Sequence, residues 1–171
     1  MKKIIKVNAF DPKSIEEAIN ELEEYKKDVE RRARLLLEKL TEAGVKIAKA
    51  KVVEYGIIHD NNLTNSINGF IDGNVGYVRV NDEYAMFFEF GTGPVGKENP
   101  HPMDGVTYRT TPWYTQADGK DMAYLYDWTP YIGDDGSVYY LASGQPAKPF
   151  MYDTALKLRD MFPSIVEEVF G

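Results

Sequence analysis

Residues 91–96 read Gly-Thr-Gly-Pro-Val-Gly and match the spacing G-x-G-x-x-G, in which glycines let the backbone approach a pyrophosphate. A dinucleotide site needs this loop between a strand and a helix, so that the helix N-terminus meets the phosphates. Pro94, Pro100 and Pro102 make a following helix improbable, and no repeated strand–helix units surround the loop. We therefore interpret the glycines as a helix end followed by a turn, and we expect no cofactor.

Metal and nucleophile chemistry has few candidate residues in this chain. It has no cysteine, which removes disulfides, thiolate metal sites and cysteine nucleophiles. The two histidines, His59 and His101, lack a recognised ligand spacing, so we expect them to be loop residues without a metal. Residues 133–137, Gly-Asp-Asp-Gly-Ser, lack the ligand spacing and closing Glu of an EF-hand and are predicted to form a hairpin turn.

Glu89 is the one acid within the aromatic and apolar run 84–90. An acid with apolar neighbours can serve as a general acid, and Asp104 or Asp127 would then supply a second carboxylate for a hydrolase. No spacing ties those acids to Glu89. We favour a structural role, in which Glu89 caps backbone groups or pairs with a basic residue of another subunit, and we expect no enzymatic activity.

Length and composition indicate a single domain over residues 1–171. The hydrophobic content of 43% suffices for a core, and the net charge of -7 argues against a nucleic-acid clamp, which needs a concentrated basic face. The N-terminus lacks the apolar core of a signal peptide, and no run approaches the roughly 20 apolar residues of a membrane span. We expect a soluble protein without a membrane partner.

Local patterns predict the elements that would position these residues. Helical spacing of apolar residues begins at Ser14, where Glu17 completes a capping box, and runs to Ala43, with an uncertain extension beyond Gly44. The remaining predictions for this half are a short strand over residues 4–10, a hairpin over residues 66–80 that turns at Asp72-Gly73, and a short helix over residues 84–90.

Residues 94–145 are predicted to form an insert, rich in proline, glycine and aromatic residues, in which helices are improbable. Residues 122–131 and 137–141 are predicted to pair as a hairpin, and a last helix is expected over residues 150–170, with Pro163 as a potential kink. The aromatic residues, Trp113 and Trp128 among them, suit a protein interface, a sugar-stacking surface or a small internal core. The predicted fold class is α+β: a long N-terminal and a C-terminal helix packed on a small antiparallel sheet, with the insert.

Two short motifs frame the insert. The first contains Tyr84, Ala85, Glu89, Phe90, Gly91, Thr92 and Gly93, and the second contains Pro146, Ala147, Pro149 and Phe150. Together with the long first helix and the hairpin, their order and spacing resemble the HK97 gp10-like family of tailed bacteriophages and prophages. These are head-tail joining proteins, also called tail-completion or neck proteins. The insert is longer than the minimal pattern of that family.

The resemblance implies a structural virion protein without enzymatic activity or cofactor. It implies an oligomeric ring, commonly homo-hexameric, between the head connector and the tail tube, with phage head connector and tail proteins as partners and with a monomer as the alternative state of the protein alone. DNA would pass through without specific binding. The expected location is the virion tail or neck, and the host cytoplasm before virion assembly. Alternatives are a tail terminator, a minor capsid component or, in another class, a carbohydrate or small-ligand binding module.

Overall fold

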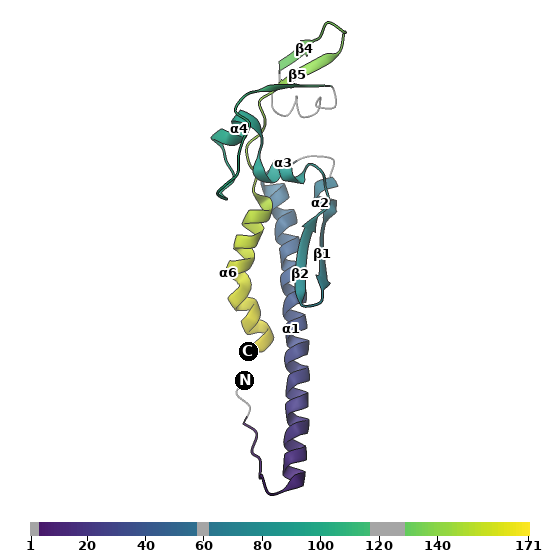
Figure 1. Cartoon of the computed structure of the whole chain (residues 1–171), viewed down its shortest axis with the longest axis vertical. Helices are drawn as coiled ribbons and strands as arrows, with labels where there is room; N and C mark the ends of the chain where they lie inside the picture. Colours follow the sequence, from purple (N-terminus) through teal and green to yellow (C-terminus); the bar gives the residue numbers. More distant parts are fainter. Residues whose placement is uncertain (1–3, 58–61, 117–128) are drawn as a thin grey trace. The chain divides into compact units, whose positions relative to one another are not determined.

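The computed structural model describes residues 4–57, 62–116 and 129–171 (Figure 1). The fold is α+β, with a long N-terminal helix, a C-terminal helix and small antiparallel sheets, as the sequence predicts. In chain order the elements are α1 (Pro12–Glu54), α2 (Asn62–Ser66), β1 (Ile67–Asp72), β2 (Val75–Val80), α3 (Ala85–Phe90), α4 (Gly93–Glu98), β3 (Trp113–Thr115), β4 (Thr129–Ile132), β5 (Val138–Ala142) and α6 (Phe150–Phe170).

The chain divides into two compact units, and both are assembled from separate stretches of sequence. The first unit contains Met1–Ile47, Asn68–Arg79 and Ala155–Gly171, and the second contains Ala48–Ile67 and Val80–Thr154. The expectation of a single folded domain stays a prediction.

In the first unit, the β1–β2 hairpin and α6 lie alongside α1 (Figure 1). The hairpin approaches closely because glycines face the helix: a β-carbon added at Gly69 would lie 2.7 Å from the Thr41 methyl group, and one added at Gly76 would overlap the Thr41 hydroxyl. Gly44 serves the same purpose on the helix, since a β-carbon there would lie 2.6 Å from Val78 and 3.1 Å from Leu158. This contact keeps Gly44 inside α1, which therefore runs well beyond the predicted end at Ala43.

The α6 helix runs antiparallel to α1 within this unit. Leu158 lies near Gly44, Lys39 pairs with Glu168 at 2.7 Å, and the Arg32 guanidinium donates to the Val169 carbonyl at 2.9 Å. The last helix confirms the predicted bounds, and Pro163 lies within it on an exposed position. The predicted strand over residues 4–10 is wrong: the described residues there form an arm that bends into α1, where the Ser14 hydroxyl accepts the backbone N–H of Asn8.

The second unit holds most of the core. Nine of the twelve buried hydrophobic residues that the described chain contains belong to it: Ala48, Val52, Ile57, Leu63, Ile67, Ala85, Phe88, Ala142 and Phe150. The first unit buries Ala18, Ile165 and Val169, so its helices keep much of their apolar surface exposed. Because its core is larger, the second unit can hold functional side chains in fixed positions more firmly than the first unit.

A three-stranded antiparallel sheet of order β3-β5-β4 belongs to the second unit. The β4–β5 pair confirms the predicted hairpin in its described part, with Ile132 opposite Val138 across the turn. The rest of that prediction, residues 122–128, lies outside the described residues. The β3 strand was not predicted, and it adds the register Trp113 opposite Ala142.

Candidate functional site

Glu89 is a buried acid of the second unit, where it is 8% exposed. Its carboxylate accepts the backbone N–H groups of Met151 at 2.8 Å and of Tyr152 at 2.9 Å. Those are early donors of α6, which an isolated helix leaves without partners. The sequence left several roles open for Glu89, and these contacts match one of them, the capping of backbone groups. The negative charge of the carboxylate also suits the positive end of the α6 dipole.

His101 completes the shell of Glu89. Its Nε2 lies 3.3 Å from Glu89 Oε1, and its Nδ1 accepts the backbone N–H of Met103 at 3.0 Å. Because Nδ1 acts as the acceptor, the neutral ring carries its proton on Nε2 and donates it to Glu89. The imidazole is enclosed by the rings of Phe90, with centroids 4.7 Å apart, and Tyr152, at 5.2 Å. His101 is a loop residue, as the sequence predicted, but it is buried and bridges Glu89 and Met103, which the sequence did not indicate.

Tyr108 fastens this histidine to the first motif. Its hydroxyl accepts the backbone N–H of His101 at 2.8 Å and donates to the Phe90 carbonyl at 2.9 Å. One phenol thus satisfies a donor and an acceptor that lie on different segments. The sequence does not indicate this role, since no local pattern connects residues 90, 101 and 108.

The Gly-Thr-Gly segment pairs with the chain just before the second motif. The Thr92 N–H donates to the Gln145 carbonyl at 2.9 Å, and the Gln145 N–H donates to the Thr92 carbonyl at 3.1 Å. Gly144, at φ +87°, allows this approach, because a β-carbon there would overlap the Thr92 carbonyl oxygen. Gly91, at φ +72°, allows a similar close approach to the backbone of Ala147, because an added β-carbon would lie 2.5 Å from the Ala147 nitrogen.

Further backbone bonds continue the contact into the second motif. The Lys148 N–H donates to the Phe88 carbonyl at 2.7 Å, and the Ala147 N–H donates to the Asn99 carbonyl at 3.0 Å. Pro149 and Phe150 then enter the core, where Phe150 is fully buried, and Pro146 is half-buried beside Gly91. We call this set of contacts, between residues 88–99 and residues 143–152, the motif frame.

Other residues of the first motif have simpler positions. Ala85 is buried and contributes to the core, while Tyr84 precedes α3, is exposed and lies against Phe87 with ring centroids 6.3 Å apart. The Tyr84 N–H donates to the Asp82 carboxylate at 2.8 Å, so the turn before α3 is held by a side chain.

The prediction that a helix after Gly93 is improbable is wrong. The α4 helix starts at Gly93, and Pro94 lies in its first turn. Backbone N–H groups in the first turn have no partner within the helix, so the missing N–H of proline costs nothing there, and its fixed φ suits the helix. The helix has six residues, and the element before the glycines is α3 rather than a strand. The strand–loop–helix context of a dinucleotide loop is therefore missing in this segment.

Trp113 binds the insert to the frame. A β-carbon added at Gly93 would meet the Trp113 ring at 2.7 Å, and the Arg109 guanidinium lies 5.2 Å from the ring centroid on a cation–π contact. Two other aromatic residues of the insert point outward: Tyr114 and Tyr131 are exposed, with ring centroids 5.5 Å apart. Trp128, Asp127 and His59 lie outside the described residues.

A second polar cluster, which no sequence pattern indicates, joins the end of α1 to the start of α6. The Tyr55 hydroxyl donates to the Asp153 carboxylate at 2.7 Å, and Lys51 lies 3.4 Å from the same carboxylate and 3.0 Å from Glu54. Burial, reinforced by the Asp153 carboxylate, raises the pKa of Tyr55 to about 12. The bond to Glu54, and then Asp153, raises the pKa of Lys51.

The remaining candidates have structural contacts. Asp135 accepts the Ser137 N–H at 3.0 Å, as predicted for a turn, and that bond lowers the pKa of Asp135. Burial alone lowers the pKa of Lys148, which lies within the second motif. Among the described residues, no three His, Cys, Asp or Glu side chains gather as a metal site would require, and no helix has the length and apolar character of a membrane span.

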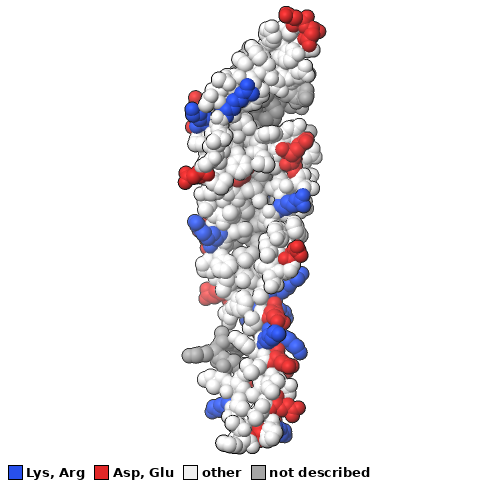
Figure 2. Space-filling view, viewed as in Figure 1, with Lys and Arg blue, Asp and Glu red and all other residues white. Residues whose placement is uncertain are grey.

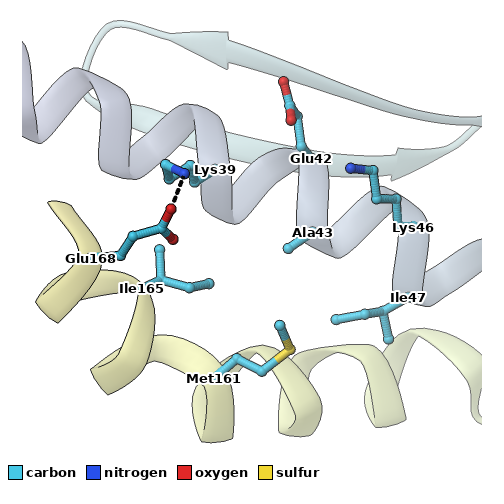
Figure 3. Close-up of a pocket in the computed structure, with 8 residues that line it drawn as sticks. All are labelled: Lys39, Glu42, Ala43, Lys46, Ile47, Met161, Ile165 and Glu168. Atoms are coloured by element: carbon cyan, nitrogen blue, oxygen red, sulfur yellow. Dashed lines mark hydrogen bonds and ion pairs between the residues drawn. The ribbon is translucent and has the colours of Figure 1, made fainter.

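The first unit contains a groove of about 360 Å³ between α1 and α6 (Figure 3). Ala43, Ile47, Met161 and Ile165 line it, and the Lys39–Glu168 pair closes one end. The charged lining residues are Lys39, Glu42, Lys46 and Glu168, and Lys39 and Glu168 already bond one another. The groove therefore presents apolar surface without converging polar groups, and we assign it no chemistry.

No protein-family model, curated protein or solved structure matches this chain.

Proposed function

We propose that this protein is a structural component of the head–tail junction of a tailed bacteriophage or prophage, where it assembles as a ring between head connector and tail tube. The observation that carries the proposal is the motif frame. The two motifs through which the chain resembles the HK97 gp10-like family lie far apart in sequence, yet Thr92 and Gln145 exchange backbone hydrogen bonds.

The frame fixes both ends of the insert. Because both of its ends are clamped, the insert leaves the core from a fixed base, which is how folds commonly present binding loops. Glu89, Tyr108 and the crowded glycines hold that base without offering a reactive group to solvent, since Glu89 and His101 are both buried. This supports a role in positioning contacts rather than in catalysis.

The insert carries aromatic surface suited to a protein partner. Tyr114 and Tyr131 are 60% and 51% exposed, and aromatic residues contribute strongly at protein interfaces. In a ring, each subunit contacts its neighbour through two different surfaces, and the rotation between subunits closes the assembly. The net charge of -7 suits passage of DNA without binding.

Phage particles provide the test. We expect deletion of the gene to yield DNA-filled heads without attached tails, and purified virions to contain the protein at the junction. A double substitution Tyr114→Ala/Tyr131→Ala should reproduce the defect while the purified protein stays folded. Val53→Ala, which removes an exposed apolar side chain outside the insert, is the control and should leave infectivity unchanged.

The outcome also distinguishes the alternatives. Absence of the protein from virions, together with normal infectivity of the deletion strain, would reject the proposal. Location at the distal end of the tail tube or in the head shell would favour a tail terminator or a minor capsid component. Cross-linking mass spectrometry on intact particles identifies the neighbours and so separates these cases.

A carbohydrate or small-ligand binding module is the second candidate, and the exposed Tyr114–Tyr131 pair is the observation that favours it. Aromatic faces stack on sugars as well as on protein. Titration with a glycan panel, followed by intrinsic fluorescence, tests this function. A saturable response that Tyr114→Ala abolishes would support it, and a flat response across the panel would count against it.

A further inference from the structure

The N-terminal half of α1 carries an apolar stripe that the described residues of its unit cover only in part: Ala18 on this face is buried, but the larger side chains around it are not. Five side chains form it, Ile15, Ile19, Leu22, Tyr25 and Val29, and all are between 38% and 56% exposed. Their spacing follows the helical repeat, so they share one face. We call them the α1 stripe.

The described part of the chain leaves the larger side chains of the stripe accessible. The N-terminal arm does not seal it, since Phe10 is 98% exposed and the stripe itself remains accessible. The α6 helix packs antiparallel on α1 only from Arg32 onward, where Arg32 binds the Val169 carbonyl near the end of α6. Ile15, Leu22, Val29 and Leu36 are spaced by seven residues, so the stripe continues the α1 seam beyond the end of α6.

Charge is divided along this half of α1. Residues 16–24 contain five glutamates and no basic residue, whereas residues 26–34 contain five basic and two acidic residues. Figure 2 shows acidic and basic side chains beside uncharged surface on the part of the molecule that contains this helix. Two such helices side by side in parallel would oppose like charges, and the antiparallel arrangement opposes unlike charges.

We propose that in solution the α1 stripe is covered by the α1 stripe of a second copy of this chain, in antiparallel orientation, with a two-fold axis near residue 24. In this register Ile19 lies opposite Val29 of the second copy. The contact extends the antiparallel helix packing that α6 already makes on α1, over about 20 Å of helix at 1.5 Å per residue. An interface this short forms a reversible dimer that depends on protein concentration.

The pairing is independent of the proposed function. An isologous two-fold contact pairs the same surface on both copies and closes on itself, so it cannot propagate a ring. It describes the free protein, and the phage experiments above do not depend on it. Either proposal can fail alone.

Disulfide trapping gives a direct test, because the chain has no cysteine of its own. Ile19→Cys and Val29→Cys variants with tags of different size are mixed under mild oxidation. The antiparallel dimer predicts the mixed disulfide in excess over either homodimer. Glu24→Cys, on the opposite face of the helix, is the matched control and should remain uncross-linked.

Sedimentation measures the same equilibrium without a cross-link. We expect a monomer–dimer equilibrium that 0.5 M salt weakens. Leu22→Glu should raise the dimer Kd at least about tenfold, because it replaces an apolar contact near the axis with a carboxylate that the interface would have to desolvate. Leu22 is exposed in the monomer, so circular dichroism should show unchanged helix content.

Three results would overturn the proposal. The first is a monomer at every concentration up to the solubility limit. The second is homodimer disulfides from Ile19→Cys and from Val29→Cys without the mixed species, which would indicate parallel pairing. The third is a dimer that Leu22→Glu leaves intact, which would place the interface elsewhere.

Discussion

Glu89 and Met151 are 62 residues apart, and the Glu89 carboxylate accepts the Met151 backbone N–H at 2.8 Å. The bond places the acid of the first motif on the first turn of the helix that the second motif opens. The two motifs are therefore parts of one buried arrangement, and a mutation in either one acts on both. This relationship leads to predictions on stability that do not depend on the biological role.

Glu89→Gln should destabilise the second unit by about 2 kcal/mol, because a charge-assisted bond to two backbone donors is replaced by a weaker neutral one. The amide NH₂ also cannot accept the N–H that one carboxylate oxygen received. Urea denaturation followed by tryptophan fluorescence measures the change. Glu83→Gln removes an exposed acid nearby and should shift stability by no more than about 0.5 kcal/mol. Equal stability of the two variants would contradict the capping role.

Gly144→Ala should cost far more than Gly105→Ala. Both glycines have nearly the same left-handed backbone, at φ +87° and +85°. A β-carbon at Gly105 meets nothing within 4 Å, whereas one at Gly144 overlaps the Thr92 carbonyl oxygen. Backbone strain alone predicts about 1 kcal/mol for Gly105→Ala. We expect at least twice that loss for Gly144→Ala, measured by thermal denaturation, and similar losses would show that the Thr92–Gln145 bridge is dispensable.

The neutral form of His101 should be the Nε2–H tautomer, because Nδ1 accepts the Met103 N–H. Long-range ¹H–¹⁵N correlation spectra of the imidazole distinguish the two nitrogens by their chemical shifts. Glu89→Gln should keep the tautomer, since the Met103 bond is unaffected. An Nδ1–H tautomer in the wild-type protein would contradict the described geometry.

The contribution of Tyr55 to stability should disappear at alkaline pH. The pKa of its hydroxyl is raised from 10.0 to about 12 in the folded protein, so the unfolded chain releases this proton first as pH rises. The stabilisation is fully present below pH 10 and is lost towards pH 12. Tyr55→Phe should lower stability by about 1 kcal/mol at pH 7, and the difference from wild type should narrow between pH 10 and 12.

Urea denaturation at a series of pH values measures that narrowing. Tyr114→Phe is the matched control, since Tyr114 is an exposed tyrosine whose ring contact a phenylalanine retains. Its difference from wild type should stay constant across the same range. A Tyr55→Phe curve that runs parallel to wild type up to pH 12 would refute the expectation.

The sequence predicted elements whose signals are local. The hairpin at Asp72-Gly73 and the helix from Phe150 needed only turn chemistry and helical periodicity. The sequence left the end of α1 undecided because Gly44 is normally a poor helix residue, and only the packing of Val78 and Leu158 against it explains its place inside the helix. That reason is tertiary and has no local signature.

The candidate site shows the same contrast between features with a local signal and features that depend on tertiary contacts. Glu89 stood out as an acid among aromatic residues, and capping of backbone groups was among the roles considered for it. The residues around it did not stand out: no local pattern indicates that the loop residue His101 is buried or that Tyr108 bridges two segments, and none indicates the Tyr55–Asp153 bond of the second cluster. Their roles depend on contacts between segments that a single sequence does not connect, such as Tyr55 with Asp153, 98 residues away.

The distance of 63 residues between Glu89 and Tyr152 also sets an order in time. At about 5–20 residues per second, the ribosome needs roughly 3–13 s to add the stretch that separates them. During that interval Glu89 and the neighbouring phenylalanines have left the site of synthesis without the helix that will cover them. Newly made chains therefore pass through a period of exposed apolar surface, in which chaperone binding or aggregation competes with closure of the fold.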